Sequence, residues 1–380
     1  MKQLWSRLVR SNIPAKEKKK VSVAREWLNA VTFAVVAATL IRWTTVEAFV
    51  VPTPSMENTI MVGDYLFVSK FHYGTRTVRT PLQIPLTHQK IWGTNIPSYL
   101  DWVELPSYRL PGISEVKRED VVVFNVPPAY LSDRPDYPLD LKQYYVKRCV
   151  GLPGDRLEIR DRLVFANGVP LSKKPAMKWS YLVTAKDEIS RRNFAAMGVD
   201  SDDRWYLGRL PNGEAAYRLL LTEDQQKYAA TMPWITSVQD DYTTHDGPDE
   251  GIFPALRNNR WNGDNYGPLL VPHQGLTLEV TPDMLATYGE LIIQYDNPKH
   301  TSIEQGHLLL HGKTVTHYTF QQNHYFMMGD NRHNSLDSRY WGFVPEDHLV
   351  GKALFIWFSV NHDADWTNKV RWNRIFTSID

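Results

Sequence analysis

The most apolar stretch of the chain is "WLNAVTFAVVAATLI", residues 27–41. As a helix rising about 1.5 Å per residue it covers roughly 22 Å, less than the ~30 Å hydrocarbon core of a bilayer. Ten further residues supply the length but include Arg42 and Glu47, of which Arg42 can reach the far interface beside Trp43. The pattern therefore predicts a transmembrane signal anchor over residues 27–48.

Residues 1–26 are strongly basic, with lysines and arginines far outnumbering the two glutamates. The positive-inside rule places this segment in the cytoplasm and the chain after the anchor outside. A cleavable signal peptide is disfavoured because no clean A-x-A site follows the apolar run, and a buried core helix is disfavoured by the basic cluster. The sequence thus predicts a single-pass membrane protein.

Beyond the anchor, short apolar runs bounded by turn signals predict strands rather than helices. Residues 75–115 are rich in proline and aromatic residues without a steady period, and are expected to form an irregular insertion. Strands or hairpins are predicted for residues 63–74, 118–127, 144–159 and 162–171. Turns are expected at Gly151–Gly154 and at Asn167-Gly168, and the second of these is the strongest short hairpin signal.

Residues 171–305 differ from the flanking sequence because they are more polar and show no regular period. We interpret them as an inserted, non-catalytic, β-rich domain. The strand pattern returns near residue 307, so we assign residues 49–170 and 306–365 to one core and residues 366–380 to a C-terminal tail. The predicted fold class is mostly β.

The composition is that of a globular protein, with 43% hydrophobic and 22% charged residues and a net charge of +1. This balance gives no general argument for a nucleic-acid partner, and none is expected. The single cysteine, Cys149, excludes an intrachain disulfide and is expected to be a small packed residue. The histidines of residues 307–324 fit no common zinc spacing, so no metal is expected.

A serine enclosed by prolines follows the apolar segment, in "FVVPTPSMENTI", residues 49–60. Proline fixes its own φ and forces the preceding residue into an extended conformation. Thr53 should therefore be extended, and Ser55 should have little conformational freedom. Such rigidity suits a hydroxyl that must be aimed, as a nucleophile is.

A serine nucleophile needs a base and donors for the oxyanion. A lysine can be that base when burial lowers its pKa from about 10.4 by as much as 3–5 units. Lys147 lies in the apolar strand "YYVKRCV", where alternation sends Lys147 and Arg148 to opposite faces, so that one of the two must face inward or line a cleft.

Four motifs in this order behind the membrane segment resemble the bacterial type I signal peptidases: "PTPSMENTI", "REDVVVFNVP", "YYVKRCVGLPGD" and "MGDNRHNSLDSRYWGFVP". The resemblance covers residues 27–70, 115–170 and 312–358. It implies a signal-peptidase-like β-barrel or sheet core and a Ser–Lys dyad serine endopeptidase, with Ser55 as nucleophile and Lys147 as general base.

The resemblance also implies roles for the surrounding residues. Thr53 and the Ser55 backbone N–H would hold the oxyanion, and Ser335 would orient the lysine. Two shallow apolar pockets would accept small side chains at the positions one and three before the cut; they would be built by Phe49, Val51, Met56, Ile60, Tyr145 and Val146. Charged residues would brace the site without doing chemistry, namely Arg148, Asp330, Asp337 and Arg339.

Two positions depart from the family pattern. Pro54 stands where glycine is common, which leaves the oxyanion to the Ser55 N–H and Thr53. His333 stands where aspartate is common and raises the alternative of a Ser–His arrangement. We favour Lys147, because the family's eukaryotic relatives place their histidine at the position of Lys147.

The resulting hypothesis is a membrane-anchored enzyme that cleaves signal peptides from exported preproteins and needs no cofactor. The resemblance implies that its catalytic domain lies on the outer (periplasmic or extracytoplasmic) face of the cytoplasmic (inner) membrane. Its expected partners are secretory preproteins, the lipid bilayer and the protein-export translocon. Residues 354–360 are expected to form a core strand, with contact of Trp357 with lipid as the alternative. A self-cleaving regulator of the LexA type would carry a DNA-binding domain and no anchor, and an inactive binding protein would be expected to lack Ser55 or Lys147.

Overall fold

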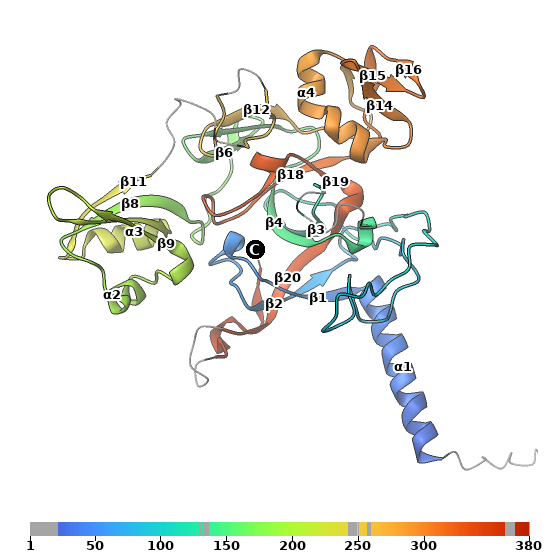
Figure 1. Ribbon diagram of the computed structural model, residues 1–380, viewed down its shortest axis with the longest axis horizontal. Coiled ribbons are helices and arrows are strands. Elements are labelled where there is room, and N and C mark those ends of the chain that lie inside the picture. The colour runs from blue at the N-terminus through green and yellow to red at the C-terminus, as the bar shows by residue number, and fades with distance from the viewer. Residues whose placement is uncertain are drawn as a thin grey trace, which may run out of the picture.

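The computed structural model describes residues 22–128, 131, 137–241, 249, 251–256, 260–361 and 369–379. Most of the predicted basic segment 1–26 therefore lies outside the described residues. The first element is helix α1, Val23–Thr44, which projects from the body of the molecule (Figure 1). It is long and apolar enough to cross a membrane by length and composition. Both ends of α1 lie four residues earlier than those of the predicted anchor, residues 27–48. The helix ends early because a strand begins at Val46.

The central sheet positions both predicted catalytic residues. Ser55 follows its first strand along the chain, and Lys147 lies within another of its strands. Its strand order is β1-β2-β20-β3-β4-β18-β19, with β21 paired to β20, and these neighbours are antiparallel. The strands are β1 (Val46–Val50), β2 (Asp64–Ser69), β3 (Val121–Asn125), β4 (Tyr144–Gly151), β18 (His324–Met328), β19 (Val344–Pro345), β20 (Leu349–Ser359) and β21 (Thr377–Ser378).

A smaller sheet extends the core beyond β4. Its order is β12-β5-β6-β7, built from β5 (Arg156–Arg160), β6 (Leu163–Ala166), β7 (Val169–Pro170) and β12 (Tyr266–Leu270). The predicted Asn167-Gly168 hairpin is confirmed, since both residues have positive φ, 53° and 79°, between the paired strands β6 and β7. Both residue types tolerate that conformation, and two successive positive φ angles are those of the turn that suits a hairpin.

Residues 177–240 form a module with a hydrophobic core of its own. Its sheet has the order β11-β8-β10-β9, and Figure 1 shows it on the far side of the central sheet from α1. We call this part the inserted module. Its elements are β8 (Trp179–Ala185), α2 (Arg191–Ala196), β9 (Arg204–Arg209), β10 (Ala215–Leu221), α3 (Glu223–Ala230) and β11 (Ile235–Asp240).

The remainder of the interval 171–305 is not part of that module. Tyr266, Leu269 and Ile292 belong to a different cluster, which also holds Leu157 of β5 and Phe326 of β18. The interval that the sequence suggested was one domain thus contains an independent module followed by chain that packs into the core. After β12, the elements of this interval are β13 (Thr277–Glu279), α4 (Pro282–Leu291) and β14 (Thr301–Glu304). They are followed by β15 (His307–Leu310), β16 (Lys313–Thr314) and β17 (His317–Thr319).

The architecture is mostly β with one N-terminal apolar helix, as predicted. The irregular character expected of residues 75–115 is also found, since no helix or strand is assigned there. The segment is nevertheless held by hydrogen bonds between its own backbone groups, such as Ile84 N to Ser98 O and Leu100 N to Leu82 O. Part of the predicted C-terminal tail is ordered as β21 on β20.

Candidate active site

The serine predicted as nucleophile lies in a single helical turn, Pro54–Met56, that follows β1. Thr53 precedes the turn with φ −130° and ψ 149°, so its predicted extended conformation is confirmed. Pro54 takes the first helical position, where its missing N–H costs nothing. Ser55 is 8% exposed and lies at the wall of a cleft. The local sequence thus fixes the backbone of the serine from both sides.

Lys147 of β4 reaches this serine from the opposite wall of the cleft. Its Nζ lies 2.5 Å from Ser55 Oγ and 3.1 Å from the carbonyl oxygen of Val146. The side chain is almost completely buried, at 3% exposure, and its Nζ lies 5.3 Å from the centre of the Tyr145 ring. Two residues 92 positions apart in the chain are therefore in direct hydrogen-bond contact.

Burial lowers the pKa of Lys147 from 10.5 to about 8, because the ammonium form loses its hydration. The carboxylates of Asp337 and Asp330 act in the opposite direction and keep the pKa from falling further. At pH 7 about a tenth of the amine is then uncharged, far more than for an ordinary lysine. An uncharged amine in contact with a hydroxyl can accept its proton.

The alternation of β4 sends Arg148 away from the cleft and into the interior. Arg148 and Asp330 form a bidentate ion pair, with distances of 2.8 Å for Nε–Oδ1 and 2.7 Å for Nη2–Oδ2. Both side chains are buried, and Thr59 donates to the same carboxylate at 2.6 Å. The pair therefore links β4, the loop after β18 and the segment after the serine turn.

A second buried ion pair lies nearby, between Asp337 and Arg339, with Nε–Oδ1 and Nη2–Oδ2 both at 2.9 Å. Asp337 also accepts the N–H of Gly329 at 3.0 Å and caps the short helix α5, Ser338–Trp341. Arg339 holds the pKa of the Asp337 carboxyl below its usual range despite burial. The two carboxylates near Lys147 are thus each tied to an arginine.

Ser335 lies beside the serine turn but makes no hydrogen bond to Lys147 among the described residues. A Cβ on Gly329 would lie 2.2 Å from Ser335 Oγ and 2.4 Å from the carbonyl oxygen of Ser55, so the three residues are in close contact. The Ser335 hydroxyl is near enough to Asp337 to help lower its pKa, without the geometry of a good hydrogen bond. Its expected role in orienting the lysine stays a prediction.

The cleft has a volume of about 740 Å³ and runs along β1 and the start of β4. Four of the predicted pocket residues line the cleft, namely Phe49, Val51, Tyr145 and Val146. Thr53 also lines it and is exposed. Met56 and Ile60 do not line it; both are completely buried in the cluster against which Phe49 and Val146 pack. They therefore fill the space beneath the cleft.

Tyr144 and His88 also line the cleft, although no role is predicted for either from the sequence. The Tyr144 ring packs edge-on against Phe49 at 4.8 Å and stacks with His88, which comes from the irregular 75–115 segment, at 4.8 Å. The tandem "YYV" was the only sequence signal for Tyr144. No sequence signal pointed to His88, because the irregular segment that contains it has no hydrophobic period that would predict which side chains face the core.

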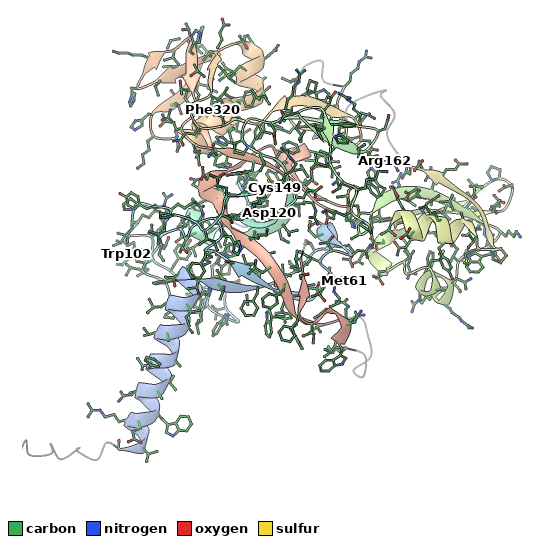
Figure 2. All side chains as sticks on the ribbon, turned by 180° about the vertical axis from the view of Figure 1, so that it is seen from behind. Met61, Trp102, Asp120, Cys149, Arg162 and Phe320 are labelled. Carbon is green, nitrogen blue, oxygen red and sulfur yellow. The ribbon has the colours of Figure 1, made fainter. Side chains whose placement is uncertain are left out.

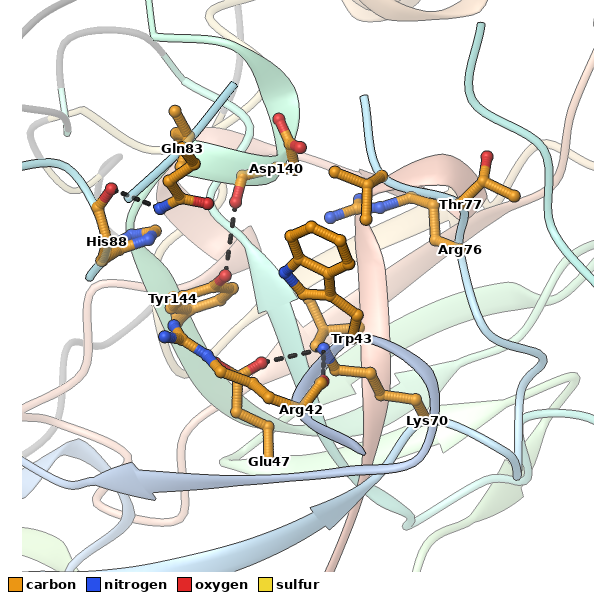
Figure 3. A pocket seen from close by; sticks show the side chains of 13 residues that line it. Arg42, Trp43, Glu47, Lys70, Arg76, Thr77, Gln83, His88, Asp140 and Tyr144 are labelled. Atoms are coloured by element: carbon orange, nitrogen blue, oxygen red, sulfur yellow. Dashed lines mark hydrogen bonds and ion pairs between the residues drawn. The ribbon is translucent and has the colours of Figure 1, made fainter. Parts of the chain in front are cut away.

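The end of the cleft reaches the end of α1. Figure 3 shows the adjoining polar pocket. There Glu47 forms ion pairs with Arg42, Oε1 to Nε at 2.5 Å, and with Lys70, Oε2 to Nζ at 2.9 Å. Arg42 and Glu47 line both this pocket and the cleft. Arg42 lies in the last turn of α1 and pairs with Glu47. Its expected reach to the membrane interface stays a prediction.

His333, the alternative base, makes its hydrogen bonds elsewhere. Its Nδ1 accepts the N–H of Ser180 at 2.9 Å, and its Nε2 lies 2.8 Å from Asp264 Oδ1. Both ring nitrogens are therefore engaged with the inserted module and with the loop before β12. Asn331 of the same motif, to which the sequence analysis gave no role, instead contacts the serine turn, donating from its backbone N–H to Ser55 O at 3.1 Å.

Comparison with known proteins agrees with this geometry. The family model described as signal peptidase, peptidase S26, matches residues 24–216 and 286–358. Signal peptidase I of Buchnera aphidicola subsp. Acyrthosiphon pisum is 25% identical over 332 residues, covering 87% of this chain and 74% of its own. The Haemophilus influenzae protein of that name is 26% identical over 360 residues, covering 94% and 77%. That of Rickettsia canadensis is 26% identical over 386 aligned residues, covering 97% of both chains. The chain belongs to the signal peptidase family S26, a family of membrane-bound serine endopeptidases that process signal peptides.

Proposed function

We propose that this chain removes N-terminal signal peptides from secretory preproteins with a Ser–Lys dyad formed by Ser55 and Lys147. The observation that carries the proposal is the buried Lys147 amine, 2.5 Å from Ser55 Oγ and with a pKa of about 8. A lysine in this state can act as a general base near neutral pH, which an exposed lysine cannot. The engagement of His333 with Ser180 and Asp264 favours the lysine over the histidine.

In the proposed reaction, the uncharged Lys147 amine takes the proton of the Ser55 hydroxyl as Oγ attacks the carbonyl carbon before the cut. The carbonyl oxygen becomes an oxyanion, which the Ser55 N–H and the Thr53 hydroxyl stabilise. When the C–N bond breaks, the Lys147 ammonium gives its proton to the leaving amine, and the mature protein departs. Lys147 then takes a proton from water, whose oxygen attacks the acyl carbon, and Ser55 recovers its proton as the ester breaks.

The substrate preference follows from the walls of the cleft. Phe49, Val51, Tyr145 and Val146 are apolar or aromatic, and the space beneath them is filled. Filled space makes shallow pockets, which admit a small side chain and exclude a large one. We therefore propose that small residues are preferred at the positions one and three before the cut.

We also propose that α1 spans the membrane with its N-terminus in the cytoplasm and the catalytic domain on the outer face. The 75–115 segment contacts the end of α1, since Thr75 Oγ1 donates to Thr44 O at 2.6 Å and Arg42 Nη1 to Thr87 O at 3.1 Å. It exposes many apolar side chains, among them Trp102 at 82%, which Figure 2 shows beside the helix end. Aromatic residues at such a level suit contact with the lipid interface. Preproteins delivered by the export translocon would reach the cleft at this same level.

The test is cleavage of a model preprotein by the detergent-solubilised full chain. We expect two products, with mass spectrometry placing the cut after a small residue, and no cleavage by Ser55→Ala. Replacing the alanine before the cut with a leucine should reduce cleavage strongly, because the pocket cannot hold it. Cleavage that persists in Ser55→Ala, or that tolerates the leucine, would contradict the proposal.

A further inference from the structure

The inserted module contacts the serine turn through a small buried network. Lys178, which immediately precedes β8, and Asp203, at the end of the helical turn Ser201–Asp203, form an ion pair within the module. Each side chain is only 1% exposed. An ion pair buried to this degree is costly to desolvate and is weak evidence for stability, so its position calls for another explanation.

Asn331 connects this ion pair to the nucleophile. Its Nδ2 lies 3.4 Å from Asp203 Oδ1 and donates to the carbonyl oxygen of Pro54 at 3.3 Å, while its backbone N–H donates to Ser55 O. Asn331 is completely buried, so it has no water to replace these partners. An amide group has two donor hydrogens, and an acceptor at Asp203 for one of them fixes the direction of the other.

The backbone of Lys178 is aligned with the same loop. Its N–H donates to Asp330 O at 3.1 Å, and its carbonyl oxygen accepts the N–H of Arg332 at 3.0 Å. Asn58 Nδ2, just after the serine turn, donates to Ala176 O at 3.3 Å. The start of the module is therefore bonded on both sides of Asn331 and to the serine turn itself.

The orientation of the Pro54 carbonyl determines that of a catalytic donor. The peptide bond between Pro54 and Ser55 is trans, and a planar trans peptide holds its C=O and N–H pointing in opposite directions. The Pro54 oxygen accepts the N–H of Glu57 at 2.9 Å as well as Asn331 Nδ2, and groups that fix this C=O on one side of the turn aim the Ser55 N–H toward the other. That N–H is the backbone donor proposed for the oxyanion, and misaiming such a donor costs rate rather than binding.

We propose that Asp203 and Lys178 of the inserted module are positioning residues, which hold Asn331 so that the Ser55 N–H is aimed at the oxyanion. This inference rests on the proposed Ser–Lys function. Asp203 supplies the acceptor for Asn331, and Lys178 compensates the buried charge of Asp203. The module is then part of the catalytic apparatus, although none of its described residues lines the cleft.

The experiment compares two double variants that both remove the buried charges. Lys178→Met with Asp203→Asn keeps an oxygen at position 203 for Asn331, whereas Lys178→Met with Asp203→Leu has nearly the same shape and no acceptor. We expect the asparagine variant to keep kcat within about threefold of wild type and the leucine variant to lose about 10- to 100-fold in kcat, with KM unchanged in both. The pH at which activity rises should be that of wild type in both, because Lys147 is untouched.

Controls separate this inference from a structural effect and from the function itself. Lys173→Met with Glu223→Leu removes a solvent-exposed ion pair at the edge of the module, 2.8 Å in length, and should leave kcat unchanged. If the leucine variant does not fold, Asn331→Ser tests the same link, since it removes Nδ2 from Pro54 O and keeps the backbone bond to Ser55; kcat should fall by a similar factor. Equal kcat in the two double variants, or a change in KM alone, would overturn the inference. Absence of cleavage by wild type would instead refute the proposed function.

Discussion

Two buried lysines lie close to the serine turn, and their surroundings are opposite. Lys147 has no carboxylate within ion-pair distance among the described residues, and its nearest polar contact is the Ser55 hydroxyl. Lys178 is equally buried but faces Asp203 in an ion pair. Burial alone thus does not decide what a lysine does. A buried amine without a carboxylate tends to lose its proton and can serve as a base, whereas one that faces a carboxylate is engaged in an ion pair and can link two parts of the structure.

Replacing each of the two lysines with arginine should have very different effects. Arginine stays protonated in proteins, so Lys147→Arg removes the base and should reduce kcat/KM by about 10²- to 10⁴-fold. Lys178→Arg keeps a cation opposite Asp203 and should lose no more than about tenfold, mainly through the strain of a larger buried side chain. Preprotein cleavage, with thermal melting to verify folding, checks both. Similar losses in the two variants would mean that the lysines do not differ in role.

Gly329→Ala should have the next largest effect. The new Cβ would lie 2.4 Å from Ser55 O and 2.2 Å from Ser335 Oγ, so the serine turn must move. Because displacement of a nucleophile by about 1 Å can cost about 10²-fold, we expect kcat to fall by up to this factor. Single-turnover cleavage measures it. Wild-type kcat in a folded Gly329→Ala protein would show that the turn tolerates movement.

The pH dependence of cleavage should distinguish Lys147 from His333 as the base. A base with a folded-state pKa of about 8 is protonated below that pH, so kcat/KM should rise about tenfold per pH unit up to about pH 8 and then level. His333→Ala should leave this limb in place, because His333 is bonded to Ser180 and Asp264. A limb near pH 6 that vanishes in His333→Ala would identify the histidine as the base.

Cys149 gives the smallest expected effect, on the same strand as Lys147. Burial raises the pKa of its thiol well above the usual range, so the thiolate is not populated. Burial favours the neutral form of both side chains, but the neutral form is the reactive one for lysine and the unreactive one for cysteine. Iodoacetamide should leave the native protein unlabelled and fully active, and should label Cys149 once the chain is unfolded. Rapid labelling of the native protein would contradict this.

The sequence predicted those features that depend on local patterns. Strand alternation separated Lys147 from Arg148, the prolines indicated the extended Thr53, and Asn167-Gly168 indicated the hairpin. The network of Asp203, Lys178 and Asn331 could not be predicted in this way. Asp203 lies 25 residues from Lys178 and 128 from Asn331, and such contacts depend on how the module docks. The position of His88 in the cleft could not be predicted either, because its segment, residues 75–115, forms no helix or strand.

The junction between helix and cleft has a consequence for shortened forms of the protein. Arg42 belongs to α1, pairs with Glu47 of β1 and lines the cleft. A soluble fragment that starts after the helix would retain Ser55 and Lys147 but would leave Glu47 without Arg42 and the cleft open at its far end. Such a fragment should hydrolyse short peptides that occupy only the dyad's end of the cleft, while discriminating poorly among preproteins by the residues further upstream. Through Arg42, helix α1 then forms part of the cleft wall in addition to the membrane-spanning role proposed for it.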